Sequence, residues 1–387
     1  MKLIAVVTPN TDTFTNPTMT TLFHLLAEKG VAVYLFGPEQ QPACPDNIGN
    51  VTLVRSKFML YLFRNPSKYK EHWKSYLEIR RIIREKRIKT LLAVDPLGLI
   101  IGGRIKRIFR MKVHLSYLSF EIFFKNELSG YYLKMKEKEI SYSQYIDSLL
   151  TQDTRRKELL LEENNISISD KQIALVPVSP LKIDVKDKPD LHRKFGIPKE
   201  KKLAVYSGSV GEWCGTKSIL EAYDKGYWNQ DFHLIFHTRK PIDEGNEFYA
   251  GLKRLDDDVS IPFTLHPHPF DSFEALSGFL SGFDVALALY YPNNQNPYYG
   301  MNMKEIGLSS GKFSTYMMLG LPTIVTPCKV YEELIKEYKF GAVMSEDSQL
   351  GEKLDEISNQ KNESYILFEN KLDPINQLNY FVNRIEI

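Results

Sequence analysis

The segment from Gly307 to Pro322, GLSSGKFSTYMMLGLP, combines residue types that can hold a phosphate. A glycine and two serines, Ser309 and Ser310, lead into an expected helix that a later glycine ends. The first turn of a helix presents unpaired N–H groups and a partial positive charge, so it attracts anions. Lys312 adds a formal charge in that turn, where a lysine is otherwise unfavourable. The segment predicts a phosphate site, with an ordinary capped helix as the alternative.

Other nucleotide-binding patterns are missing from the sequence. The first expected strand is followed by TPNTDTFTNP, which has no glycine, and there is no P-loop motif. Both absences argue against a dinucleotide-dependent oxidoreductase and against an ATPase.

A metal site is not expected either. The run from Asp256 to Asp258 lies between a predicted helix and a predicted strand, which favours a polar turn. His233, His237 and the turn around His266 lack the further ligands that zinc would need. His237 and Arg239, at the end of FHLIFHTR, are expected either to meet a diphosphate or to be structural.

Strands and helices alternate along the chain, which predicts parallel sheets covered on both faces. The expected strands of the first half cover residues 3–7, 31–36, 90–94, 113–118, 148–151 and 172–176, with helices at 17–29 and 67–86. Those of the second half cover 203–206, 232–236, 261–265, 285–289 and 323–325. The fold class is therefore α/β, with two Rossmann-like doubly wound domains facing a central cleft.

Four prolines mark the expected boundary between these domains. We predict a first domain over residues 1–178, a linker over 179–201 and a second domain over 202–362. A helix over 363–387 is expected to pack back on the first domain.

Composition indicates a globular protein of the cytoplasm. The three cysteines form no CxxC motif, which favours a reducing compartment. The opening residues, MKLIAVVTPN, predict a buried strand and no secretory leader, and no apolar run is long enough to span a membrane.

Residues 55–112 carry a strong local charge. They hold 17 lysines and arginines against four acids, a net charge of +13. Three interpretations stay open: a solvated helix face, peripheral contact with an anionic membrane at its inner face, and nucleic acid. No nucleic-acid-binding motif accompanies the charge, so nucleic acid is not expected as a partner. Apolar residues interleave the charges, as suits a membrane: Phe58, Leu60, Tyr61, Leu62, Phe63, Tyr69, Trp73 and Tyr76.

The sequence SSGKFSTYMMLGLPTIVT resembles the donor-site helix of GT-B glycosyltransferases, of the kind that build bacterial polysaccharides. YSGSVGEWCGTKSILEAY is similar to the first strand and turn of their nucleotide-sugar domain. SGFDVALALYYP is similar to the strand before the donor-site helix, and VHLSYLSFE to a strand that ends in an acid at the cleft. IDSLLTQDTRRKELLLEENNI, followed by QIALVPVSP, resembles the end of the acceptor domain, so the likeness covers almost the whole chain.

This resemblance implies a hexosyltransferase-like enzyme of cell-surface polysaccharide or glycoconjugate synthesis. Its partners would be a nucleotide diphosphate sugar and a glycan or lipid-linked acceptor, and it would need no cofactor and no metal. Glu121 would be the general base for the acceptor hydroxyl, with a solvated loop acid as the alternative. His114 is a candidate second catalytic group on the acceptor side. The implied donor-site residues are Gly208, Ser209, His237, Arg239, His266, Tyr290, Ser309, Ser310, Gly311 and Lys312.

One departure from the family concerns two glutamates that many retaining members carry. Gly307 and Thr315 stand at those positions, and Glu305 is two residues out of register. The usual carboxylate contacts to the ribose and the sugar are therefore not implied here. A nucleotide-sugar epimerase of the same fold and a non-catalytic glycosyltransferase-like subunit stay as alternatives.

Overall fold

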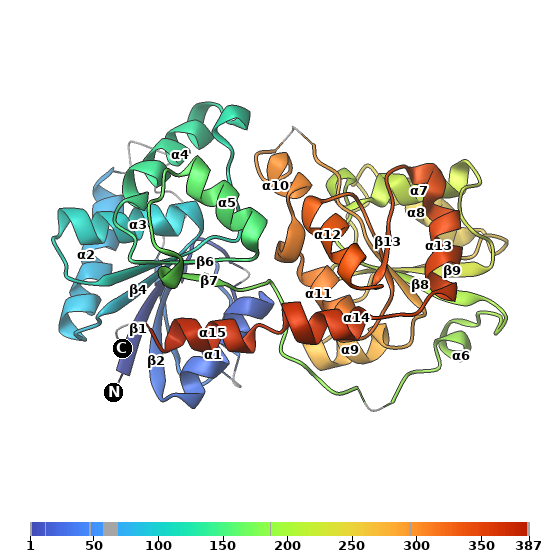
Figure 1. Ribbon diagram of the computed structural model, residues 1–387, viewed down its shortest axis with the longest axis horizontal. Helices are drawn as coiled ribbons and strands as arrows, with labels where there is room; N and C mark the ends of the chain where they lie inside the picture. The colour runs from blue at the N-terminus through green and yellow to red at the C-terminus, as the bar shows by residue number, and fades with distance from the viewer. Residues whose placement is uncertain are drawn as a thin grey trace. The chain divides into compact units, whose positions relative to one another are not determined.

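The computed structural model describes residues 2–11, 13–45, 48–56, 69–185, 187–293 and 296–384, with the backbone alone over 69–72. The chain divides into two compact units (Figure 1). The first comprises Met1–Leu181 together with Pro374–Ile387, and the second comprises Lys182–Asp373.

The first unit contains a parallel sheet of seven strands in the order β3-β2-β1-β4-β5-β6-β7. Its central strands are buried on both faces, as expected for a parallel sheet covered by helices. The strands are β1 (Lys2–Val7), β2 (Val31–Pro38), β3 (Val51–Ser56), β4 (Thr90–Val94), β5 (His114–Leu118), β6 (Ser148–Thr151) and β7 (Ile173–Leu175).

Helices cover both faces of this sheet. Helices α1 (Pro17–Glu28) and α15 (Ile375–Val382) pack on one face, against Ile4, Val33 and Leu92. Helix α3 (Asp95–Ile108) lies on the other face, where Gly102 approaches Leu115 so closely that a Cβ would come within 2.7 Å of its Cδ1. The remaining helices are α2 (Tyr69–Glu85), α4 (Gly130–Ser143) and α5 (Thr154–Glu163).

The C-terminal segment differs from the single helix expected over 363–387. It consists of α14 (Ser364–Leu367), a π-helical turn (Phe368–Leu372) and α15, with Pro374 directly before α15. Proline lacks an N–H group and cannot continue a helix from the preceding turn. The segment from Pro374 onward belongs to the first unit, where α15 contacts α1 and β7.

The second unit contains a parallel sheet of six strands in the order β10-β9-β8-β11-β12-β13. Most of its strand residues are aliphatic or aromatic and buried. The strands are β8 (Lys202–Gly208), β9 (Phe232–Thr238), β10 (Phe263–His266), β11 (Val285–Ala288), β12 (Thr323–Val325) and β13 (Gly341–Val343).

Two hydrophobic clusters cover the two faces of this second sheet. One is built with α9 (Phe273–Leu280), α11 (Gly311–Met318), α12 (Lys329–Glu337) and α14. The other is built with α7 (Thr216–Asp224), α8 (Tyr249–Asp257) and α13 (Leu350–Asn359). Helix α6 (Leu191–Phe195) contributes Leu191 to the first cluster, and Ile197 joins it, so the expected linker 179–201 adds two core residues to this unit. The last helix is α10 (Met301–Lys304).

Across the described residues, every helix is too short or too polar to cross a membrane.

Candidate functional site

The strand ends of the second sheet bring the predicted donor-site residues together. In the parallel register, Ser207 of β8 lies beside His237 of β9, which lies beside His266 of β10. Helix α11 joins this edge, because the Tyr316 hydroxyl accepts a hydrogen bond from the Ser207 N–H at 3.0 Å. The carboxyl ends of parallel strands are the usual ligand-binding edge of such a sheet.

Ser310 is the N-cap of α11. Its Oγ accepts a hydrogen bond from the Phe313 N–H at 3.1 Å and lies 2.5 Å from the Tyr290 hydroxyl. The Ser310 side chain is buried and engaged on both sides, which fixes the start of the helix. The N–H groups of Gly311 and Lys312 have no acceptor within the described part of the chain. The helix start therefore offers two free N–H groups beside Ser309, which is only half-buried.

Lys312 places its ammonium group between two aromatic rings. Its Nζ lies 3.9 Å from the centre of the Tyr206 ring and 5.4 Å from that of Tyr290. The nitrogen is buried and has no hydrogen-bond partner among the described residues. Burial, and to a smaller extent the charge of Arg239, lower the pKa of Lys312 to about 8. A buried cation without a hydrogen-bonding partner is costly, and a bound anion would remove that cost.

Gly208 makes room for this lysine. A Cβ at Gly208 would lie 2.9 Å from Nζ and 2.9 Å from Cε of Lys312. The loop that follows is held in place because the carbonyl of Ser209 accepts hydrogen bonds from the Tyr206 hydroxyl at 2.7 Å and the Cys214 thiol at 3.1 Å. The Ser209 side chain is exposed. Gly208 thus borders the Lys312 ammonium, and Ser209 directly follows it in the same loop.

His237 is a neutral, fixed side chain. Its Nε2–H donates to the carbonyl of His268 at 3.0 Å, and its Nδ1 accepts from the Ser207 hydroxyl at 2.8 Å. Burial is the largest cause that lowers the pKa of His237 to about 4. The histidine therefore positions the turn after β10 and carries no charge near pH 7. Arg239, two residues on, is exposed and supplies the second positive charge of this edge.

His266 lies in an aromatic cluster. Its ring centre is 5.4 Å from that of Phe195, 5.4 Å from that of Phe279 and 6.0 Å from that of Phe270. Burial lowers the pKa of His266 to about 4, so the ring is neutral. This neutral aromatic surface at the end of β10 is chemically suited to a flat heterocycle.

The positions where glutamates occur in retaining relatives have structural contacts here. The carbonyl of Gly307 accepts from the Tyr331 hydroxyl at 2.8 Å, and Gly307 has a left-handed φ of 46°. Thr315 Oγ1 donates to the carbonyl of Gly311 at 2.8 Å. Glu305 is buried at the end of α10.

Glu121 belongs to the first unit, whereas the ten donor-site residues belong to the second. It follows β5, and its N–H donates to Oδ1 of Asp95 at 3.1 Å. The Glu121 side chain is half-buried. His114 begins β5 and lies at the opposite edge of the sheet, where its Nε2 is 3.0 Å from the Ser148 hydroxyl. The length of β5 thus separates His114 from Glu121, so the structure does not bring these two candidate catalytic residues together.

Two further residues hold the Glu121 loop and were not predicted. Asp95 has a left-handed backbone, with φ at 59°, and its Oδ1 also accepts from the Phe120 N–H at 2.8 Å. Arg156 is fully buried and donates from Nη2 to the carbonyl of Phe120 at 2.7 Å. The sequence could have identified Asp95, because it is an acid that directly follows an expected strand and precedes a proline. Arg156 lies in a helix and gave no such signal.

Comparison with known proteins gives likenesses in structure alone. No family model and no curated protein matches the sequence. HepE from Anabaena in complex with UDP-glucose superposes with a TM-score of 0.67 at 10% identity, over 99% of this chain and 99% of that chain. A sucrose-phosphate synthase from Thermosynechococcus elongatus gives 0.65 at 13% identity, over 100% of this chain and 95% of that chain. A Listeria monocytogenes structure described as a UDP-N-acetylglucosamine 2-epimerase gives 0.58 at 12% identity, over 99% of this chain and 94% of that chain. With its two parallel α/β sheets, the chain shares the GT-B fold with these structures.

Proposed function

We propose that this protein is a glycosyltransferase that binds a nucleotide diphosphate sugar at the start of α11. The observation that carries the proposal is the buried Lys312 ammonium, which has no hydrogen-bond partner among the described residues. The N–H groups of Gly311 and Lys312, in the first turn of the same helix, have no acceptor among the described residues. A diphosphate would supply acceptors to all three groups at once.

In this proposal the diphosphate is the leaving group. The acceptor hydroxyl oxygen attacks the anomeric carbon of the sugar, and the bond from that carbon to the diphosphate oxygen breaks. Glu121 takes the hydroxyl proton. Lys312, Arg239 and the helix start stabilise the negative charge that develops on the diphosphate, so no metal is required.

The aromatic cluster around His266 is proposed to receive the nucleobase. The acceptor is proposed to be a glycan or lipid-linked hydroxyl of cell-surface polysaccharide or glycoconjugate synthesis, used from the cytoplasmic side. HepE was solved with UDP-glucose, and this supports a nucleotide sugar as the ligand.

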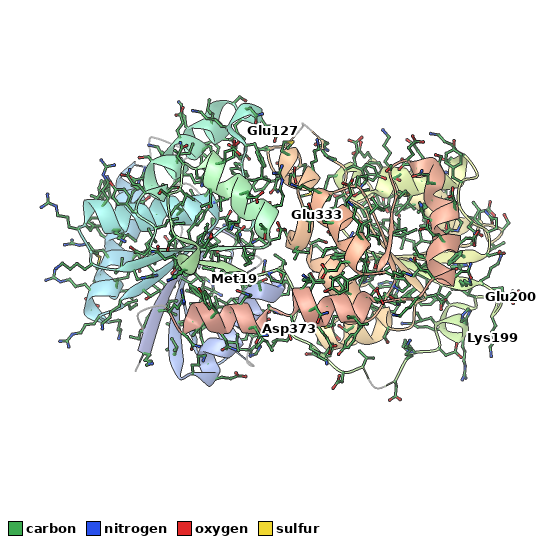
Figure 2. All side chains as sticks on the ribbon, viewed as in Figure 1. Met19, Glu127, Lys199, Glu200, Glu333 and Asp373 are labelled. Carbon is green, nitrogen blue, oxygen red and sulfur yellow. The ribbon has the colours of Figure 1, made fainter. Side chains whose placement is uncertain are left out.

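A transfer assay tests the proposal. The protein is incubated with each nucleotide sugar and a bacterial glycolipid extract, with and without EDTA, and the nucleoside diphosphate and the glycosylated product are measured by mass spectrometry. We expect both products in equal amounts, unchanged by EDTA. The variant Glu121→Gln should still bind the donor but transfer at least a hundredfold more slowly. The exposed Glu127, labelled in Figure 2, gives the matched control Glu127→Gln, which should transfer at the normal rate.

The same assay separates the alternatives. An epimerase would convert the nucleotide sugar into its epimer without any acceptor, which the Listeria likeness makes worth measuring. A non-catalytic subunit would bind the donor and leave it intact in every mixture. Either result would overturn the transferase proposal.

A further inference from the structure

We propose that an exposed face of α2 and the end of α3 docks the first unit onto a bilayer that carries anionic phospholipids. This face, here called the α2–α3 patch, is centred on Trp73, Leu77, Ile108 and Phe109. Trp73 is 36% exposed, Leu77 47% and Ile108 47%, high values for large apolar side chains. The proposal goes beyond the transfer reaction and does not depend on it.

Helical spacing gathers the patch on one side of α2. Tyr76, Ile79 and Ile83 are buried and form the face of α2 that packs inward. Trp73 and Leu77 are one turn apart on a different stripe, which continues through Arg80 and Arg84.

The end of α3 adds an aromatic side chain, Phe109, beside this stripe of α2. The Trp73 ring lies edge-on to the Phe109 ring with 6.0 Å between their centres. The Arg80 guanidinium lies 5.1 Å from the centre of the Phe109 ring. The Trp73–Phe109 contact therefore joins apolar side chains of α2 and the end of α3, and Ile108, the residue before Phe109, is also exposed.

Positive charges surround these apolar side chains. Residues 73–112 contain 12 lysines and arginines against three acids. Of the 12, Lys106 is paired with Asp147. The exposed side chains of Arg81, Arg84, Arg107 and Arg110 form no ion pair with any residue that the structure describes. Figure 2 shows long nitrogen-tipped side chains projecting outward beside α2.

A bilayer surface matches both properties of the patch. Anionic headgroups attract lysine and arginine near the surface, and tryptophan and aliphatic side chains enter the boundary between headgroups and acyl chains. A nucleic-acid backbone would satisfy the arginines but would leave Leu77 and Ile108 in water. Residues 57–68, which contain Phe58 to Phe63 of the expected membrane segment, lie outside the described residues, and the patch does not depend on them.

Vesicle flotation with the full chain tests the proposal. We expect binding to vesicles of phosphatidylcholine with 30% phosphatidylglycerol, weak binding to phosphatidylcholine alone, and a marked loss at 0.5 M salt. Trp73→Ser with Leu77→Ser, and separately Arg81→Gln with Arg84→Gln and Arg107→Gln, should each weaken binding at least tenfold.

Matched controls come from the second unit. Ile366→Ser removes an apolar side chain that is 45% exposed, and Lys199→Gln with Lys240→Gln removes exposed charges, so both should bind vesicles normally. Equal binding to both kinds of vesicle, or patch variants that bind like the unaltered protein, would overturn the proposal. Tight binding of duplex RNA to this face that Trp73→Ser with Leu77→Ser does not weaken would assign the face to nucleic acid. This result would overturn the proposal as well.

Discussion

The Lys312 ammonium lies 3.9 Å above the centre of the Tyr206 ring, in the space that the missing side chain of Gly208 leaves open. The ring face attracts the charged form of the lysine, whereas burial favours the neutral form. Burial is the larger effect, and the pKa falls to about 8. In the free protein Lys312 therefore changes its charge near pH 8, and a bound anion would favour its charged form.

Binding of a nucleoside diphosphate should depend on pH through Lys312. A phosphate attracts the ammonium form, so binding raises the pKa of Lys312 above its free value of about 8. The affinity should be constant below pH 8 and fall above it, to roughly tenfold weaker at pH 9. Isothermal titration from pH 7 to 9.5 measures this change. An affinity that stays flat across this range would show that Lys312 does not contact the ligand.

Gly208→Ala should weaken the same binding at little cost in stability. The new methyl group would lie 2.9 Å from Lys312 Nζ and displace the ammonium from the Tyr206 ring. The lysine is flexible, so we expect the free energy of unfolding to change by less than about 1 kcal/mol while the nucleotide Kd rises about tenfold or more. Gly278→Ala is the control, because its Cβ would meet open space on helix α9. Normal nucleotide affinity in Gly208→Ala would contradict the packing described for Lys312.

His266 should make the protein less stable in acid. Its pKa in the folded chain is about 4, below the ordinary value of 6.5, so the unfolded chain binds the extra proton between these values. The free energy of unfolding should therefore decrease as the pH falls from 6.5 towards 4. By urea unfolding between pH 7.5 and pH 4.5, the unaltered protein should lose about 1–2 kcal/mol more stability than His266→Phe, an amount reduced by the partial exposure of the His266 ring. The exposed His268 offers the control His268→Gln; if His266→Phe loses as much stability as that control, His266 is not the group that titrates.

Asp95 should be critical for the loop that carries Glu121. Its Oδ1 accepts the N–H groups of both Phe120 and Glu121, so Asp95→Ala leaves two donors without that acceptor. We expect a loss of about 2–4 kcal/mol in the free energy of unfolding. Asp95→Gly should lose roughly 1 kcal/mol less, because glycine adopts the left-handed backbone at φ 59° without strain. Equal stabilities of the two variants would show that the backbone at this position is unstrained.

The sequence predicted the interior strands well, because parallel strands that are buried on both faces are short apolar runs between helices. Strand β3 was missed because VTLVRS is half-exposed at the edge of its sheet and lacks such a run. Strand β13 was missed because it has only three residues, GAV. The pattern that identifies a strand weakens with length and burial, which explains both omissions.

Part of the candidate site was also within reach of the sequence. The resemblance implied His237 and His266 as donor-site residues, and the parallel register places both at the edge of the sheet that α11 joins. The placement of Lys312 over Tyr206 was beyond prediction, because it depends on packing between residues far apart in the chain. The left-handed conformation of Asp95 has the same origin, since its contacts come from the loop after β5.

The central claim, that Lys312 and the start of α11 bind a diphosphate, is tested most directly by nucleotide titration of two lysine variants. Lys312→Met removes the buried ammonium but keeps the apolar stem, and Lys329→Met does the same for an exposed lysine at the start of α12. Each nucleoside diphosphate is titrated into the three proteins at pH 7.5. We expect at least one nucleoside diphosphate to bind the unaltered protein and Lys329→Met with equal affinity, and to bind Lys312→Met about 10- to 100-fold more weakly. Equal affinity in all three proteins, or no binding of any nucleoside diphosphate to the unaltered protein, would contradict the claim.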